Sequence, residues 1–325
     1  MIVGKQDALE KSAKIWVAGG SGMAGSAIVR KLMERGYSNI IGLRSRELDL
    51  RRQQETEAYI VQESPDCVIL AAARVGGIQA NMNSPVEFLY DNLAIQNHVI
   101  YSAAKHGVRR LIFLASSCVY PRLSPQPMRE EYLLDGKPEP TNEGYALAKI
   151  AGLKLCEFIN QQYGYAYISV MPCNLYGPGD NFDPIRSHVV PALIRKVHEA
   201  KITNAQHITL WGTGKARREV MYSDDLADAC VFLLENAYSD SQFLNVGTGI
   251  DMTIQELAEI IMDVVGYRGE LRFDSSKPDG MPRKVLDVSR INALGWQAKT
   301  SLRLGLEKTY LDYLERASAE YLGTE

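Results

Sequence analysis

Short apolar segments alternate with longer helical patterns through the first half of the sequence, and this alternation constrains the fold more than any other feature. The apolar segments are residues 14–18, 39–43, 67–73, 110–115 and 167–171, and long helical patterns cover 85–106 and 144–162. Strands that are apolar throughout and separated by helices are typical of a parallel sheet covered on both faces. The sequence therefore predicts an α/β fold with a doubly wound, Rossmann-type sheet, which binds ligands at the carboxyl ends of its strands.

The pattern changes after residue 173. Residues 174–184 are rich in Pro, Gly and Asn and are predicted to form a loop. A helix is then expected over 188–200, and the capping box Thr253-Ile-Gln-Glu256 opens another helix that runs to about Val265. Strand-like segments occur at 207–211, 219–222 and 243–246. The later half therefore predicts a smaller, mixed α/β C-terminal domain.

These patterns suggest how the chain is divided. The Rossmann domain is expected to comprise residues 14–173, with returns near 219–247 and 284–300. The smaller domain is expected to comprise 174–218, 248–283 and 301–320. Residues 1–13 carry charges throughout and are expected to be a flexible N-terminal extension.

Composition excludes several classes of protein. The net charge of the 325 residues is −3, so no basic surface points to nucleic acid or anionic lipid. The sequence contains no run of about 18 uncharged apolar residues, so no membrane span is expected, and residues 1–13 do not resemble a signal peptide. The five cysteines are scattered without a Cys-x-x-Cys pair, which favours reduced thiols over disulfides or a metal site. We therefore expect a soluble cytoplasmic protein without a metal ion.

A glycine-rich segment connects the first predicted strand to a helix predicted from Met23 to Arg35. Gly19, Gly22 and Gly25 have the spacing G-x-x-G-x-x-G. Such glycines permit a tight turn, let backbone N–H groups approach a pyrophosphate, and let the helix pack close to the sheet. A glycine-rich turn without a ligand is the alternative. The predicted cofactor loop consists of Gly19, Gly20, Ser21, Gly22, Met23, Ala24 and Gly25.

The end of the second predicted strand indicates which dinucleotide binds. NAD-dependent enzymes usually place an acidic residue there, which binds the ribose 2′-hydroxyl. This chain has Leu43-Arg44-Ser45-Arg46 instead. Because two cations suit a 2′-phosphate, Arg44 and Arg46 predict NADP(H) rather than NAD(H). A solvated basic loop is the alternative interpretation.

Tyr145 and Lys149 form a Tyr-x-x-x-Lys pair on a predicted helix, with both side chains on one face. An ammonium group beside a phenol is expected to lower the phenol pKa, so that the phenol exchanges a proton with a carbonyl or alkoxide. The spacing alone is common and carries little weight. It gains weight from Ser116, which follows the fourth predicted strand and is expected to face the ligand crevice.

Together, the glycine loop, Ser116 and the Tyr145–Lys149 pair resemble the extended short-chain dehydrogenase/reductase superfamily over residues 14–315. Further segments are similar to the GDP-L-fucose synthase family, namely Val75-Gly-Gly-Ile78, Ser116-Ser-Cys-Val-Tyr-Pro121, Met171-Pro-Cys-Asn-Leu-Tyr-Gly-Pro178, Ser187-His-Val-Val-Pro191 and Lys277-Pro-Asp-Gly280. The resemblance implies an NADPH-dependent enzyme that epimerises C3 and C5 of GDP-4-keto-6-deoxy-D-mannose and then reduces C4. The Rossmann domain would bind NADP(H), and the smaller domain would bind the GDP-sugar.

The resemblance also implies catalytic roles. Ser116 and Tyr145 would bind the C4 oxygen, Cys118 would act as the base and His188 as the acid, and Lys149 would hold the nicotinamide ribose. Because C3–H and C5–H are both alpha to one carbonyl, a single enolate chemistry would serve both carbons. The alternatives are that Cys118 is an inert core residue and that His188 is a surface residue near a helix start.

The remaining site residues follow from the resemblance alone. Cofactor contacts are expected from Leu114, Ala115, Lys149, Pro172, Cys173, Asn174, Leu175 and His188, and GDP-sugar contacts from Lys196, Trp211, Arg218 and Asp279. A solvated Arg217–Arg218 pair and a core position for Trp211 are the alternatives. The chain departs from the family at Gly20-Ser21, where His-Arg is frequent, and at Gly144, where proline is expected. The first departure leaves the 2′-phosphate to Arg44 and Arg46, and the second predicts a looser helix start.

Three rival functions remain open. A sister epimerase–reductase of the GDP-colitose synthase type would epimerise only C5, a 4-epimerase would use tightly held NAD, and a non-catalytic regulator would only sense NADP. The resemblance further implies a homodimer formed by the helices at 85–106 and 144–162. Apolar residues on the second helix fit such an interface and equally fit packing against the sheet; they are Leu147, Ile150, Leu153, Leu155 and Phe158.

Overall fold

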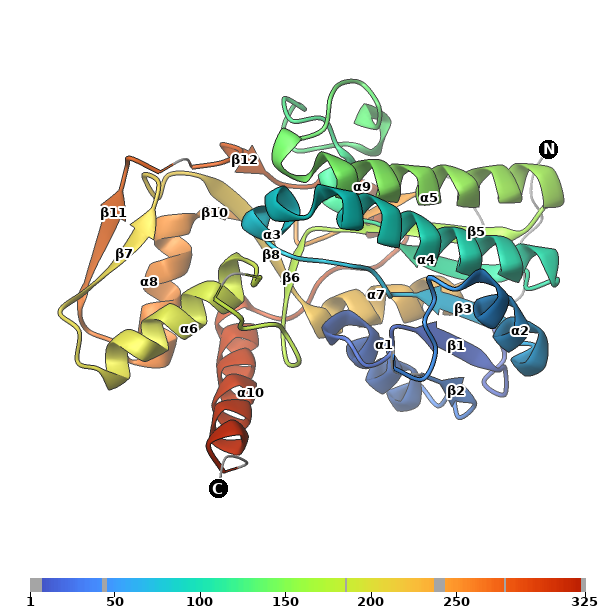
Figure 1. Ribbon diagram of the computed structural model, residues 1–325, viewed down its shortest axis with the longest axis horizontal. Coiled ribbons are helices and arrows are strands. Elements are labelled where there is room, and N and C mark those ends of the chain that lie inside the picture. Colours follow the sequence, from blue (N-terminus) through green and yellow to red (C-terminus); the bar gives the residue numbers. More distant parts are fainter. Residues whose placement is uncertain (1–7, 43–45, 185, 237–242, 278, 323–325) are drawn as a thin grey trace.

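The computed structural model describes residues 8–42, 46–184, 186–236, 243–277 and 279–322. Its centre is a six-stranded sheet in which every pair of neighbours is parallel (Figure 1). The strand order is β2 (Ile40–Ile41), β1 (Ile15–Ala18), β3 (Cys67–Leu70), β4 (Arg110–Leu114), β5 (Ala166–Pro172) and β9 (Leu244–Val246). The chain runs outward from β1 to β2 and then returns past β1 to β3. The predicted doubly wound Rossmann-type sheet is therefore confirmed.

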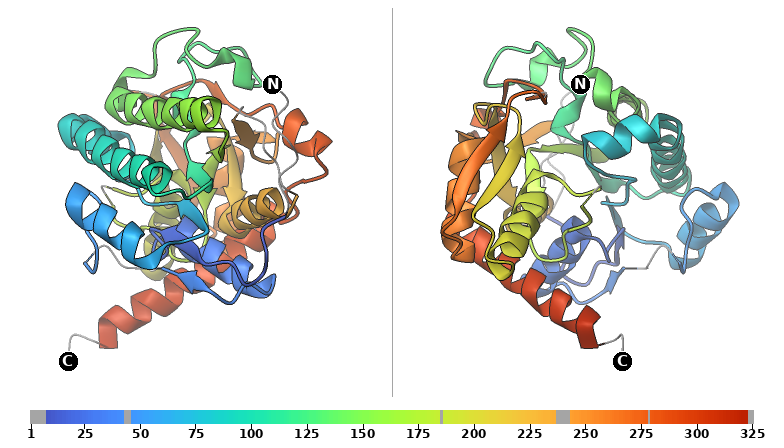
Figure 2. Two further views of the ribbon diagram at one scale, coloured as in Figure 1. Left: turned by 90° about the vertical axis from the view of Figure 1, so that its right-hand side faces the viewer. Right: turned by 60° about the vertical axis from the view of Figure 1, so that its left-hand side comes forward.

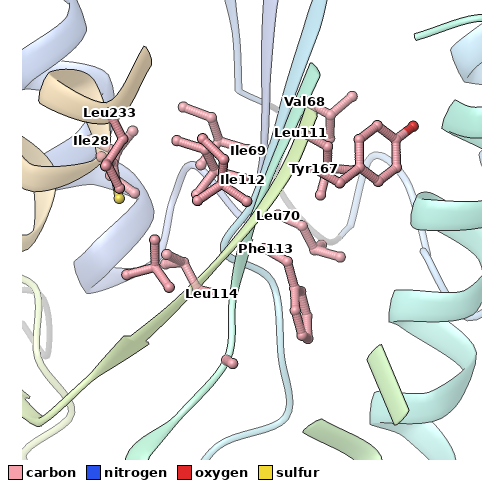
Figure 3. Packing of buried hydrophobic residues seen from close by; sticks show 14 of the residues in the cluster. Ile28, Val68, Ile69, Leu70, Leu111, Ile112, Phe113, Leu114, Tyr167 and Leu233 are labelled. Atoms are coloured by element: carbon pink, nitrogen blue, oxygen red, sulfur yellow. The ribbon is translucent and has the colours of Figure 1, made fainter. Parts of the chain in front are cut away.

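Helices cover both faces of this sheet (Figures 1 and 2). One face carries α1 (Met23–Glu34) and α7 (Ser223–Glu235), and the other carries α2 (Gln53–Glu63), α4 (Pro85–Lys105) and α5 (Glu143–Tyr163). In Figure 3, Ile112 and Leu114 of β4 point toward the α1–α7 side, whereas Leu111 and Phe113 point toward the opposite side. Successive side chains of a strand face opposite sides of a sheet. A sheet covered on both faces therefore needs strands that are apolar throughout.

Residues 8–13 pack against this core, although the sequence analysis expected a flexible extension. The side chains of Leu9 and Ala13 are buried in the larger hydrophobic cluster. The Leu9 N–H donates to the Leu234 carbonyl at 3.5 Å, and Lys11 pairs with Glu235 at the end of α7. The expectation is wrong for this part of the segment, because isolated apolar residues inside a charged sequence are enough to dock it. Residues 1–7 lie outside the described residues.

A smaller four-stranded sheet is built around β8 (Arg217–Tyr222). This strand pairs antiparallel with β10 (Asp251–Thr253) and parallel with β12 (Arg283–Lys284). It also pairs with β6 (Asn174–Tyr176), so the predicted loop over 174–184 is wrong at its first three residues. Proline and glycine begin only after Tyr176, which leaves 174–176 free to pair. A separate parallel pair consists of β7 (His207–Trp211) and β11 (Glu270–Asp274).

A second hydrophobic cluster lies beneath these strands and is formed largely by α6 (Val189–Ile202), α8 (Ile254–Val265) and α10 (Leu302–Leu322). The predicted capping box of α8 is present, with Thr253 Oγ1 accepting from the Glu256 N–H at 3.0 Å and Glu256 accepting from the Thr253 N–H at 2.7 Å. The chain thus has two separate hydrophobic clusters, and β8 pairs with strands of the smaller sheet, although its residues 219–222 were expected to return to the Rossmann domain. Short helices complete the chain: α3 (Ile78–Asn83), α9 (Ser289–Ala293), and the 3-10 turns η1 (Ser117–Val119), η2 (Glu130–Tyr132) and η3 (Pro140–Asn142).

Within the ranges given above, none of the helices combines the length and the apolar character needed to span a membrane.

Candidate active site

A cleft of about 1670 Å³ runs along the carboxyl ends of the strands of the larger sheet and continues to the smaller sheets. Its walls include the glycine loop after β1, the segment 71–77 after β3, the segment 115–118 after β4 and residues 172–175 at the end of β5. The chain turns back between β1 and β3, and ligands of doubly wound sheets bind at such a reversal. The cleft therefore lies where the topology places a ligand site.

The glycine loop forms a close cradle at the start of α1. Gly19 has φ +88°, and a Cβ there would lie 2.6 Å from the Ala72 nitrogen. A Cβ at Gly25 would lie 2.0 Å from the Gly19 carbonyl oxygen. Gly22 is the N-cap of α1 and supplies no side-chain cap, so the first N–H groups of the helix remain available for an anion. These features fit the pyrophosphate of a dinucleotide.

Most of the predicted cofactor residues line the cleft. They are Gly19, Ser21, Gly22, Met23, Ala24, Gly25, Arg46, Leu114, Ala115, Lys149, Pro172, Cys173, Asn174, Leu175 and His188. Gly20 is not among the lining residues. A Cβ at Gly20 would lie 3.1 Å from Gly42 Cα, so this glycine serves the packing of the loop against β2 and its turn. Arg44 lies outside the described residues.

Ser116, Tyr145 and Lys149 converge on the same wall of the cleft. Ser116 is the N-cap of η1, directly after β4, and its Oγ accepts from the Cys118 N–H at 3.2 Å. Lys149 lies one turn after Tyr145 on α5, with its Nζ 5.8 Å from the centroid of the Tyr145 ring. The same Nζ donates to the Leu114 carbonyl at 2.8 Å. The predicted spacing therefore brings the hydroxyl, the phenol and the ammonium group to one place.

Burial dominates the protonation of this pair, contrary to the sequence-based expectation for the phenol. Burial, reinforced by the nearby Cys118, raises the pKa of Tyr145 above its usual range, and the hydrogen bond with Ser116 offsets only part of the rise. Burial also lowers the pKa of Lys149 to about 7. A phenol removed from water loses more from desolvation than a partly neutral lysine can restore.

Cys118 has the opposite electrostatic environment. Its side chain is half-buried at the cleft, which excludes the interpretation as an inert core residue. Lys284 Nζ of β12 donates to Cys118 Sγ at 3.3 Å. Burial would raise the pKa of the thiol, but the Lys284 ammonium, together with side-chain hydrogen bonds, holds the pKa below its usual value. Asn142 of η3 is one of these hydrogen-bond partners.

His188 reaches the cleft from the residue directly before α6. Its segment is docked on the loop after β3, because the Gly77 N–H donates to the Arg186 carbonyl at 3.1 Å. A Cβ at Gly77 would lie 2.7 Å from the Ser187 carbonyl oxygen, so only glycine permits this approach. The His188 side chain is exposed to the open cleft, where desolvation by the surrounding walls and the Lys284 charge lower its pKa. A proton on this imidazole is therefore released more readily than usual.

The four predicted GDP-sugar residues differ in their positions. Trp211, Arg218 and Asp279 line the cleft, whereas Lys196 does not. Trp211 is 63% exposed, so it is not a core residue.

Hydrogen bonds of the other three residues define their positions. Lys196 Nζ donates to the Thr209 carbonyl at 2.7 Å. Arg218 Nη1 donates to the Met281 carbonyl at 2.6 Å. The Asp279 carboxylate accepts from the Thr213 N–H at 2.6 Å and from its hydroxyl at 2.8 Å, which ties two loops together.

Comparison with known proteins identifies the family. The sequence model of the NAD dependent epimerase/dehydratase family matches residues 15–247. The chain belongs to this family.

Relatives within the epimerase/dehydratase family are close. The chain is 54% identical to GDP-L-fucose synthase 1 of Arabidopsis thaliana, over 94% of each protein. It is 50% identical to GDP-L-fucose synthase of Escherichia coli (strain K12), over 93% of this chain and 97% of the relative. The crystal structure of a GDP-L-fucose synthetase from Naegleria fowleri bound to NADP superimposes with a TM-score of 0.88 at 28% identity, over 96% of this chain and 97% of that one. The resemblance found in the sequence is confirmed.

Sequence reasoning missed two members of this epimerase/dehydratase site, Asn142 and Lys284. Both line the cleft and contact Cys118. Lys284 follows the recognised segment 277–280, but β12 has only two residues and gives no strand signal. Asn142 lies in the entry to α5, where it reads as a helix start. Among the described residues, no group of three or more His, Cys, Asp or Glu side chains is placed to hold a metal ion.

Proposed function

We propose that the protein converts GDP-4-keto-6-deoxy-D-mannose to GDP-L-fucose with NADPH, by epimerising C3 and C5 and reducing C4. The main support is the position of Cys118, whose thiol has a lowered pKa. It lies in the same cleft as His188 and as the group formed by Ser116, Tyr145 and Lys149. A simple reductase or a 4-epimerase needs only the last three. The identity of about half of the residues to curated GDP-L-fucose synthases supports the same activity.

The cradle formed by the glycine loop suits NADP(H). Backbone N–H groups at the start of α1 would bind the pyrophosphate, and Arg46 would contribute to binding the 2′-phosphate. Lys149 would bind the nicotinamide ribose, and residues 172–175 would border the nicotinamide. When bound, NADPH supplies the hydride that C4 receives.

Epimerisation would use Cys118 and His188. Cys118 would remove the proton alpha to the C4 carbonyl, at C5 or at C3. His188 would return a proton to the opposite face of that carbon. Ser116 and Tyr145 would donate hydrogen bonds to the C4 oxygen and stabilise the charge of the enolate. The lowered pKa of Cys118 supports its assignment as the base, because a base must be deprotonated before it can accept a proton.

Reduction would use Tyr145 as the acid. Its raised pKa keeps the phenol protonated at neutral pH. The phenol therefore retains its proton through epimerisation and transfers it only when C4 becomes an alkoxide, which is a stronger base. Ser116 would hold the same oxygen throughout.

The GDP part of the substrate would bind beside the smaller sheets. Trp211 would stack on the base or sugar and Arg218 would bind phosphate. Asp279 would act by holding its loop through Thr213. Lys196 would need to leave the Thr209 carbonyl to reach substrate.

The activity is tested with the purified protein, GDP-4-keto-6-deoxy-D-mannose and NADPH in deuterated water. We expect NADPH consumption and a GDP-fucose product with deuterium at both C3 and C5, read by NMR. Cys118→Ser should lose deuterium incorporation while still binding NADPH. Deuterium at C5 alone would refute the double epimerisation and indicate a sister reductase. Consumption of NADPH without deuterium at either carbon would refute the epimerase role altogether.

We also propose a homodimer formed by α4 and α5, which lie side by side (Figure 1). Ile150 and Leu153 are buried, but Leu147 and Phe158 of α5 are exposed. On α4, Val86, Tyr90 and Tyr101 are also exposed. An unpaired apolar surface of this kind favours association.

Light scattering coupled to gel filtration tests the dimer. The Leu147→Glu, Phe158→Glu double variant should shift the protein to the monomer mass. Met33→Glu, which replaces an exposed residue on α1, should leave the mass unchanged. A double variant with the mass of the wild type would contradict the proposed interface. All five cysteines are free, and because Cys118 must stay reduced to act as a base, we propose that the enzyme works in the cytoplasm.

A further inference from the structure

Lys284 is held rigidly at the edge of the cleft. The Val285 N–H donates to Gln126 Oε1 at 3.0 Å, and the Met128 N–H donates to the Val285 carbonyl at 2.8 Å. The Leu286 N–H donates to the buried carboxylate of Glu219 at 2.7 Å. Residues 285 and 286, which directly follow Lys284, are therefore fixed by hydrogen bonds to two other segments, and the Lys284 side chain starts from a defined point.

The ammonium group of Lys284 faces sulfur. Its Nζ lies 3.3 Å from Cys118 Sγ, and among the described residues no carboxylate lies within ion-pair distance of it. A half-buried cation without a counterion is unfavourable. Deprotonation of the thiol would supply the missing negative charge at contact distance.

We propose that Lys284 is a positioning residue that holds Cys118 as a thiolate, so that the sulfur is ready to act as the base. The role of that thiolate in epimerisation rests on the proposed function. In that step the C–H bond alpha to the ketone breaks, its proton moves to the Cys118 sulfur, and its electron pair forms the enolate whose charge lies on the C4 oxygen.

The other groups around the sulfur are consistent with this role. Ser116 and Asn142 are neutral and offer hydrogen bonds. Tyr145 is the other titratable group coupled to Cys118, and it remains protonated because burial and the Cys118 charge raise its pKa. His188 feels the same Lys284 cation, which favours its neutral form. Among the described residues, Lys284 is thus the cationic side chain that lies in contact with the thiol.

The thiolate can be titrated directly in the substrate-free protein by its absorbance near 240 nm, with Cys118→Ser as the blank. The other cysteines do not interfere, because burial raises the pKa of Cys67, Cys156 and Cys230 to about 12 and that of Cys173 well above its usual value. We expect the Cys118 midpoint to lie below the ordinary thiol value of about 8.5. A midpoint at or above that value in the wild-type protein would overturn the proposal.

Substitutions of Lys284 separate the effect of its charge on Cys118 from the effect of its packing. Lys284→Met should raise the Cys118 midpoint by about one to three pH units, as expected when an opposite charge in contact is removed. Lys284→Arg should keep the midpoint near that of the wild type, and Lys299→Met, which replaces an exposed lysine elsewhere, should not shift it. An unchanged midpoint in Lys284→Met would overturn the proposal. If Lys284→Met does not fold, the wild-type titration decides.

Kinetics distinguish this role from substrate binding. For deuterium exchange into the GDP-sugar at neutral pH, Lys284→Met should have a lower kcat than the wild type and nearly the same KM. The difference in kcat should shrink as the pH rises. A raised KM with an unchanged thiol midpoint would make Lys284 a substrate ligand and overturn the proposal. Because the titration uses no substrate, a shifted midpoint without GDP-fucose formation would refute the proposed function but not the Lys284–Cys118 pairing.

Discussion

Gly25 offers a direct test of how the cofactor loop is built. A Cβ at residue 25 would lie 2.0 Å from the Gly19 carbonyl oxygen, 2.7 Å from its carbon and 2.9 Å from Gly20 Cα. All three contacting atoms belong to backbone, so no side chain can rotate away. Gly25→Ala must therefore push α1 away from the loop or distort the turn at Gly19.

The expected magnitude follows from two opposing terms. Overpacking destabilises by about 1–3 kcal/mol, and contacts this short place Gly25→Ala near the upper end, at about 3 kcal/mol. Alanine is favoured over glycine within a helix by up to about 1 kcal/mol. The net loss is then about 2 kcal/mol, or a fall in Tm of roughly 4–8 °C at about 2–4 °C per kcal/mol.

Gly22→Ala in the same loop is the matched control. Its Cβ would approach only the Gly19 carbonyl oxygen, at 3.6 Å, which is an ordinary contact. We expect its free energy of unfolding to stay within about 0.5 kcal/mol of the wild type, which leaves Tm nearly unchanged. Its NADPH affinity, measured by fluorescence titration, should fall because the methyl group enters the cradle. Calorimetry on the apo protein compares the two variants. Equal Tm values for Gly25→Ala and Gly22→Ala would refute the reasoning.

Three further predictions concern other parts of the site. Lys149 is buried and its pKa is lowered to about 7, so the wild-type protein loses folding stability as pH falls from about 10.5 to 7. The free energy of unfolding of Lys149→Met should therefore rise relative to the wild type by a few kcal/mol over that window. A difference in denaturant midpoints that does not change with pH would contradict this. Gly77→Ala should displace the Ser187–His188 segment and slow deuterium incorporation, while NADPH binding stays unchanged in a parallel titration. Trp211→Ala should raise the KM for the GDP-sugar about tenfold, as expected for loss of one stacking contact, with kcat retained; an unchanged KM would exclude Trp211 from the substrate site.

The predictable parts of this protein are those encoded within one segment. Strands that are apolar throughout required a sheet covered on both faces, and Gly19, Gly22 and Gly25 marked the turn between β1 and α1. The capping box of α8 was likewise legible, because both partners lie three residues apart. In each case the physical cause acts over a few neighbouring residues.

The parts that the sequence did not predict depend on contacts between distant segments. Lys284 and Cys118 are separated by 166 positions, and β12 is too short to show a pattern. Asp279 reads as a substrate ligand, yet its carboxylate is held by Thr213, 66 positions away. Gly144 was expected only to loosen the start of α5, but a Cβ there would lie 2.9 Å from the Pro85 carbonyl oxygen, so glycine allows α4 to approach. Such roles become visible only when the chain is folded.

The proposed chemistry needs two neighbouring groups whose pKa values are shifted in opposite directions. Tyr145 must remain protonated while Cys118 is deprotonated, although both lie in the same cleft beside Ser116. The asymmetry arises from where the two lysines point. Lys149 directs its Nζ to the Leu114 carbonyl and is itself partly neutral, so burial decides the state of the phenol. Lys284 directs its Nζ to sulfur.

Lys284 belongs to the smaller sheet and Cys118 follows β4 of the larger one, so the contact that we propose to favour the thiolate forms only while the two parts are apposed. The proposed base is therefore assembled from both parts, whereas Tyr145, the proposed acid of the reduction, is supplied by α5 of the larger part alone. A change that separates the smaller sheets from the larger one should impair epimerisation first, because Lys284 reaches Cys118 from across the cleft, whereas Ser116 and Tyr145 both belong to the larger part.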